Sequence, residues 1–249
     1  MGDLTQIVYS ARGNWLALAG SAGFQVSYSL TGEAKAGLAQ RVGPVAGVAF
    51  SPDEQLLATA GRQLQVWNVA EGQPVMTLEG HATGVTSVAF SPAGPLMASA
   101  GEDGSLRIWQ VGDGRLLRQL EPHAAAVTTV SFSPAGRLLA TGDAAGTLRL
   151  YDTASGALRH QWQGHAAAVI TAAFLPKSGG LATAGRDQRV QVWDLAPSPP
   201  ASIFAEQLTG LTSLAVARQR DVLAMAGRDG AVRLWEKVVP RGEATGSGR

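Results

Sequence analysis

The segment Met97-Ala98-Ser99-Ala100-Gly101, followed after a turn by Leu106-Arg107-Ile108-Trp109, decides the fold because its pattern returns along the chain. The aromatic residue that closes the pattern recurs at a spacing of 42 residues. A fixed period of this length indicates an array of one supersecondary unit, and such arrays build extended binding surfaces. The aromatic residues with this spacing are Trp67, Trp109, Tyr151, Trp193 and Trp235.

Each repeat contains four segments of strand length. The first ends in Phe-Ser-Pro, as at residues 90–92 and 132–134, and the second and third are the pair quoted above. A glycine recurs a few residues after the aromatic residue, as Gly114 does after Trp109. A fourth apolar segment such as residues 116–120 comes next. Gly, Pro, Asp and Ser turns separate the segments, and none has a sustained helical period. Four strands in about 42 residues fit one blade of a β-propeller.

The N-terminal part extends the pattern in weaker form. Residues 15–20 match the second strand of a repeat and residues 24–27 match the third, with Ser27 in place of the aromatic residue. In the following repeat, five residues separate Gly61 from Trp67, whereas seven separate Gly101 from Trp109, so the second repeat has a shorter turn. We therefore count six repeats, of which the first is degenerate.

The pairs Gly80-His81, Gly164-His165 and Trp193-Asp194, with Ser-Pro-Ala-Gly turns at 91–94 and 133–136, resemble WD40 repeats. The resemblance covers residues 4–235. It implies an all-β propeller of six four-stranded blades, in which the sixth has four strands or only three. We expect one domain over residues 3–240, with repeats 3–41, 42–80, 81–122, 123–164, 165–206 and 207–240, and a disordered tail at 241–249.

The resemblance also implies a hydrogen-bonded network in each well-formed blade. A buried polar group needs a partner, and a closed network specifies one packing. The third repeat has the set His81, Ser99, Asp103 and Trp109, and the fifth has His165, Thr183, Asp187 and Trp193. The fourth keeps His123 and Thr141 but has Ala145 at the Asp position. Asp143 lies two residues early, and whether it substitutes stays open.

Catalytic and metal-binding alternatives are less well supported. Three histidines could bind zinc, but their matched positions in separate repeats favour a structural role, and His160 lies outside that register. The chain has no Cys, no G-x-S-x-G elbow and no phosphate-binding glycine loop with Lys. We therefore expect no enzyme activity, no metal and no cofactor, although a propeller's central channel can host an active site or a small ligand.

Composition indicates the domain size and argues against nucleic-acid binding and membrane insertion. A chain of 249 residues with 45% hydrophobic content forms one sizeable domain. A net charge of +1 gives no electrostatic footprint for nucleic acid. No stretch is long and apolar enough to span a bilayer. The first strand is expected almost at the start of the sequence, so we expect no signal peptide. We expect a cytoplasmic protein that is a monomer or a subunit of a larger complex.

The ends of the array pose a separate question. Propellers of this family usually close by taking one strand of the last blade from the N-terminus, and here little precedes residue 4. We expect the ring to close as a slightly irregular propeller. The alternative is an open ring that receives a strand or blade from a partner or from sequence outside this chain.

The function we expect is a scaffold for protein–protein interaction that binds a protein or peptide on its loop face. The alternatives are a small-ligand binder or enzyme that uses the central channel, or a regulatory sensor module of a larger signalling protein. By the resemblance, the loop face carries the turns before the first strand and between the second and third. The candidate partner-binding residues are Arg41, Arg62, Thr83, Glu102, Asp143, Arg186, Gln207 and Arg228.

Overall fold

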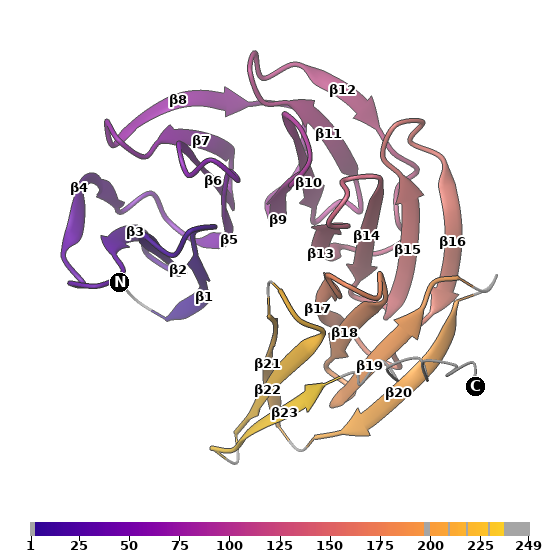
Figure 1. The fold of residues 1–249 in the computed structure, drawn as a ribbon. Coiled ribbons are helices and arrows are strands. Elements are labelled where there is room, and N and C mark those ends of the chain that lie inside the picture. Colours follow the sequence, from indigo (N-terminus) through magenta and orange to yellow (C-terminus); the bar gives the residue numbers. More distant parts are fainter. Residues whose placement is uncertain (1–2, 197–199, 209, 218, 229, 237–249) are drawn as a thin grey trace, which may run out of the picture.

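A computed structural model describes residues 3–196, 200–208, 210–217, 219–228 and 230–236 of the chain. The strands form six antiparallel sheets, each built from strands that are consecutive in the sequence. The sheets are arranged around a common centre as the blades of a propeller (Figure 1). The prediction of an all-β propeller with six blades is confirmed. The predicted tail at 241–249 lies outside the described residues.

The first three blades have four strands each. Blade 1 consists of β1 (Leu4–Tyr9), β2 (Trp15–Gly20), β3 (Gly23–Tyr28) and β4 (Ala34–Gln40). Blade 2 consists of β5 (Val45–Phe50), β6 (Leu56–Gly61), β7 (Leu64–Asn68) and β8 (Gln73–Leu78). Blade 3 consists of β9 (Val85–Phe90), β10 (Leu96–Gly101), β11 (Leu106–Gln110) and β12 (Leu116–Gln119).

The second half of the chain forms the other three blades. Blade 4 consists of β13 (Val127–Phe132), β14 (Leu138–Asp143), β15 (Thr147–Asp152) and β16 (Leu158–Gln163). Blade 5 consists of β17 (Val169–Phe174), β18 (Leu181–Gly185), β19 (Arg189–Asp194) and β20 (Ala201–Gln207). Blade 6 has three strands within the described residues, β21 (Leu211–Val216), β22 (Val222–Gly227) and β23 (Val232–Glu236).

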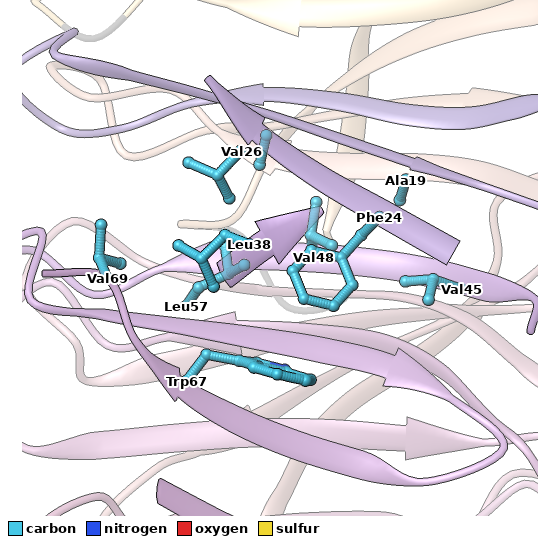
Figure 2. Packing of buried hydrophobic residues seen from close by; sticks show 10 residues of the cluster. Ala19, Phe24, Val26, Leu38, Val45, Val48, Leu57, Trp67 and Val69 are labelled. Carbon is cyan, nitrogen blue, oxygen red and sulfur yellow. The ribbon is translucent and has the colours of Figure 1, made fainter. Parts of the chain in front are cut away.

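The core lies between the blades rather than inside any one of them. Side chains alternate between the two faces of each sheet, so every blade offers one apolar face to the blade before it and one to the blade after it. Figure 2 shows the interface of blades 1 and 2, where Phe24 of β3 meets Trp67 of β7 edge to face with ring centroids 4.9 Å apart. Val45, Val48 and Leu57 complete this cluster from blade 2.

The ring is open between blade 6 and blade 1. The innermost strands pack against one another in the order β1, β5, β9, β13, β17 and β21, and among the described residues no comparable packing joins β21 to β1. Figure 1 shows the opening between these two end blades. The expectation that the ring closes is therefore corrected. Closure depends on the angles between blades, which no residue pattern inside one repeat determines.

Candidate functional site

Blade 5 contains an unbroken chain of hydrogen bonds from tryptophan to carboxylate. Trp193 Nε1 donates to Thr183 Oγ1 at 2.9 Å, and that hydroxyl lies 2.8 Å from His165 Nε2. His165 Nδ1 lies 3.0 Å from an oxygen of Asp187. A neutral ring with its proton on Nδ1 satisfies every group, because Thr183 then donates to Nε2 and His165 donates to the carboxylate.

Blade 3 has the same ring position but a different neighbour. His81 Nε2 lies 2.7 Å from Ser99 Oγ, which also accepts a hydrogen bond from Trp109 Nε1. Asp103 is farther from His81, at 4.0 Å, because Ser105 Oγ and the Arg107 guanidinium each lie 2.8 Å from His81 Nδ1. A guanidinium only donates, so Nδ1 accepts here and the ring is again neutral.

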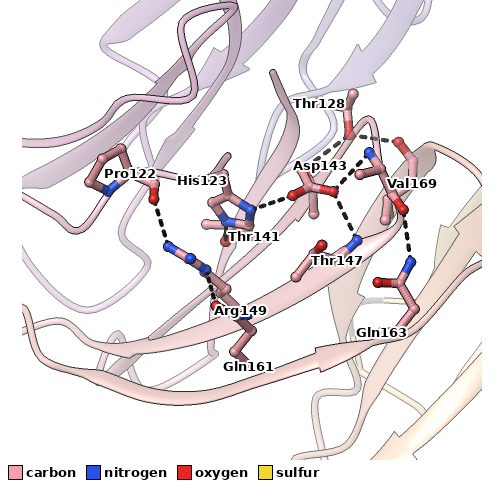
Figure 3. A network of polar contacts seen from close by, with 12 residues as sticks. Pro122, His123, Thr128, Thr141, Asp143, Thr147, Arg149, Gln161, Gln163 and Val169 are labelled. Carbon is pink, nitrogen blue, oxygen red and sulfur yellow. Dashed lines mark hydrogen bonds and ion pairs between the residues drawn. The ribbon is translucent and has the colours of Figure 1, made fainter. Parts of the chain in front are cut away.

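Blade 4 completes its network with an aspartate from a different position (Figure 3). His123 Nε2 lies 2.7 Å from Thr141 Oγ1, and Nδ1 lies 2.8 Å from Asp143 Oδ2. Asp143 is buried, and its other oxygen accepts hydrogen bonds from the backbone N–H groups of Ala145 and Thr147. The prediction that Asp143 lies on the partner-binding face is therefore corrected, because its carboxylate is enclosed within the blade.

The position of Asp143 explains how this substitution works. Blades 3 and 5 have glycine there, and a Cβ added to Gly185 would lie 2.4 Å from His165 Nδ1. A side chain at this end of the strand therefore points at the histidine. In blade 4 the carboxylate comes from the strand end, and the turn position holds Ala145 instead. The paired change of Gly to Asp and Asp to Ala was the sequence signal that could have identified it.

Burial keeps these histidines neutral. The pKa of His81 is lowered to about 4, first by burial and then by the nearby Arg107 charge, against the attraction of Asp103. Burial also lowers the pKa of His123 and of His165, although their hydrogen bonds to Asp143 and Asp187 oppose the shift. Each ring is bonded within its own blade. Among the described residues, no group of three His, Cys, Asp or Glu side chains could hold a metal ion.

Blade 2 lacks this network and contains a cavity instead. Trp67 Nε1 donates to Thr59 Oγ1 at 3.1 Å, but the His position is occupied by Arg41, whose side chain is exposed. A cavity of about 390 Å³ opens beside Thr59, between Pro44 and the turn that carries Arg62. The cavity therefore takes the place that a buried histidine fills in blades 3, 4 and 5.

The turn between the second and third strands opens a second cavity beside the first. In blades 3 and 4 this turn contains Gly104 or Gly146, both with positive φ, whose carbonyl oxygen accepts from the N–H of His123 or His165 in the next blade. The turn of blade 2 contains only residues 62 and 63. A cavity of about 350 Å³ lies between this short turn and His81 of blade 3.

We define the blade 2 groove as these two cavities and the turn between them. Arg62 and Gln63 line both cavities. A third, smaller cavity of about 230 Å³ lies beside Arg41, toward blade 1. The length difference of the turn was visible in the sequence, but the groove was not predicted, because it also depends on the missing histidine and on how closely adjacent blades approach.

The other candidate partner-binding residues are distributed around the loop face. All of them except Asp143 are exposed, and only Arg41 and Arg62 line a cavity described above. The exposed set is Arg41, Arg62, Thr83, Glu102, Arg186, Gln207 and Arg228.

The central channel is the alternative site. It forms a cavity of about 470 Å³ lined by the innermost strands and rich in hydroxyl groups. Two of these hydroxyls already have partners, because Thr86 donates to the Val127 carbonyl and Thr128 donates to the Val169 carbonyl at 2.6 Å. Their bonds join neighbouring blades. The channel side chains of the described residues include no acid, base or metal ligand. In the same part of the chain, no helix is long and apolar enough to cross a membrane.

Comparison with known proteins identifies the repeat type. A family model described as the IFT122 first beta-propeller matches residues 44–237. The chain is 33% identical over 97 residues to an uncharacterized WD repeat-containing protein, sll1491, of Synechocystis sp.. It is 39% identical over 61 residues to the target of rapamycin complex subunit wat1 of Schizosaccharomyces pombe, and 43% identical over 58 residues to the Polycomb protein EED of Chaetomium thermophilum.

These similarities are local. They cover 38%, 23% and 22% of this chain, respectively. The chain spans only 28%, 19% and 10% of the lengths of those relatives. The comparisons therefore bear on the repeat and its fold more than on the activity of any whole relative.

Proposed function

Because the chain belongs to the WD-repeat β-propeller family, whose matching model is the IFT122 first beta-propeller, we propose that it is a non-catalytic scaffold that binds a protein or peptide on its loop face. Relatives named as a target of rapamycin complex subunit and a Polycomb protein support protein partners in general. The proposal goes further and assigns the contact to the blade 2 groove.

The observation that carries this assignment is the pair of cavities beside Arg62. In blades 3, 4 and 5, a histidine and a longer turn fill the same space. In the blade 2 groove, Gln63, Gln65 and Thr59 offer hydrogen-bonding groups and Arg62 provides charge, while Arg41 lines the neighbouring third cavity. Arginine is enriched among the residues that dominate binding at protein interfaces, and polar groups in a cavity fix the orientation of what binds there.

The test compares two double variants on the same face. Arg41→Ala with Arg62→Ala removes charge at the groove, whereas Arg186→Ala with Arg228→Ala removes two exposed arginines from blades 5 and 6. All four side chains are exposed, so both variants should keep the wild-type melting temperature. Each protein is immobilised and incubated with lysate of its source organism, and captured proteins are identified by mass spectrometry.

We expect a partner that wild type and the Arg186/Arg228 variant retain and the Arg41/Arg62 variant loses. Equal capture by all three proteins would exclude the groove as the contact site. If no protein were captured and a purified small metabolite slowed amide hydrogen exchange at the channel threonines, the channel alternative would replace the proposal.

A further inference from the structure

The two end blades of the open ring carry matching, uncovered apolar faces. On blade 6, Val232 and Leu234 of β23 are 68% and 73% exposed. On blade 1, Leu4 and Ile7 of β1 are 52% and 57% exposed. The strands that carry these pairs, β23 and β1, belong to the two blades on either side of the opening seen in Figure 1. We call the space between these two faces the seam.

The register shows that these residues occupy core positions. Val232 and Leu234 precede Trp235 as Leu64 and Val66 precede Trp67. The residues at these two positions in blades 1 to 5 are at most 2% exposed: Phe24, Val26, Leu64, Val66, Leu106, Ile108, Leu148, Leu150, Val190 and Val192. In those five blades the next blade covers them. At blade 6 the same face of the sheet has no neighbour among the described residues.

The same argument holds on the other side of the seam. Leu4 pairs with Gly20 and Ile7 with Leu18, as Val85 pairs with Gly101 and Val88 with Ser99. The preceding blade covers Val85 and Val88, which are 3% and 7% exposed. Leu4 and Ile7 are therefore exposed apolar side chains at positions that an adjacent sheet covers in the packed blades.

The five packed interfaces indicate which side chains an occupant of the seam must present to blades 6 and 1. The occupant needs large apolar residues and an aromatic side chain toward Val232 and Leu234, as blade 3 offers to blade 2. Toward Leu4 and Ile7 it needs alanines and branched apolar residues, as blade 2 offers to blade 3. A sheet with both faces is one more blade of the same repeat. Residues 237–249 are 13 in number, far fewer than one repeat of 42, so this sequence does not contain it.

We propose that the seam binds a blade-forming segment of a second polypeptide, which packs between blades 6 and 1 and completes the ring. The contact is separate from the blade 2 groove and does not depend on the function proposed above. The contacts are those of a propeller core, so apolar burial supplies the binding energy, and the exposed charge of the loop face contributes little.

The probe for this proposal is a fluorescently labelled polypeptide with the sequence of residues 123–164, the fourth repeat. Binding to the full chain is followed by anisotropy, and the masses by analytical ultracentrifugation. We expect saturable binding of one probe per chain. Val232→Asp with Leu234→Asp should weaken it at least about tenfold, because two charges would be buried at the interface. These side chains are exposed in the free chain, so the melting temperature should stay unchanged.

The matched control is Leu30→Asp with Leu116→Asp, which alters exposed apolar residues of the turn between β3 and β4 and of β12, at 98% and 43% exposure. It should bind the probe as wild type does, and so should the Arg41/Arg62 variant. Failure of the probe to bind, or equal binding to the Val232/Leu234 variant, would overturn the proposal. So would self-association that this variant abolishes, which would assign the seam to a second copy. Tenfold tighter binding after truncation at Glu236 would assign it to residues 237–249.

Discussion

At the scale of single residues, the buried histidines hold blades 3, 4 and 5 each in one arrangement because both nitrogens of every ring have a partner. Blade 5 shows this most fully, with four groups linked from Trp193 to Asp187. The members of that chain could be named from the sequence because they follow the repeat register. Asp143 could not, because the direction in which a side chain points from the end of a strand is a property of the fold.

Replacement of His165 by alanine should lower the free energy of unfolding by about 1–3 kcal/mol, because Thr183 and Asp187 would lose their buried partner. Denaturant titration followed by tryptophan fluorescence measures this loss. His160→Ala is the matched control, since His160 is only half-buried on β16 and lies outside the network. Its effect should be within about 0.5 kcal/mol. Equal losses for both variants would contradict a structural network.

At the scale of elements, the turns between second and third strands determine whether adjacent blades are sealed on the loop face. Gly104 and Gly146 allow the turn to reach the histidine of the next blade, and both have positive φ. A Cβ on Gly146 would lie 2.1 Å from the His165 carbonyl oxygen. The short turn at Arg62 makes no such contact within the described part of the chain, and the groove results.

Gly146→Ala should therefore destabilise the protein by about 3 kcal/mol, through backbone strain and the clash with His165 together. Gly13→Ala separates the two causes. Gly13 has a similar φ of +79°, but an added Cβ would meet nothing within 4 Å. Its cost should be the strain alone, about 1 kcal/mol. The difference between the two, measured by thermal and chemical unfolding, gives the contribution of the contact between blades. A difference near zero would show that the turn yields to the extra carbon.

At the scale of the whole molecule, the six-fold repetition was predictable and the opening was not. The spacing of Trp67, Trp109, Tyr151, Trp193 and Trp235 places one blade after another. The angle between two blades, however, depends on how all the side chains of both faces interlock. The exposed pair Val232 and Leu234 looks like any other core pair when only the letters are read.

Hydrogen exchange should reveal this difference along the chain. Amides of β14 and β15, whose blade is covered on both faces, should exchange roughly tenfold or more slowly than those of β2 and β22 in the end blades. Mass spectrometry of peptides from the labelled protein measures each blade separately. Uniform protection across all six blades would mean that the seam is covered in solution. Addition of the fourth-repeat polypeptide should slow exchange in blades 1 and 6 and leave blade 4 unchanged.

The open seam also changes how the molecule responds to force. In a closed ring, a rotation of one blade must be compensated by the other blades. This ring is open and has five packed interfaces between its two end blades. In an open ring, small rotations at successive interfaces, including the one beside Arg62, add together. Their sum changes the position of blade 6 relative to blade 1. The separation between blades 6 and 1 therefore reports the sum of small rearrangements at all the packed interfaces.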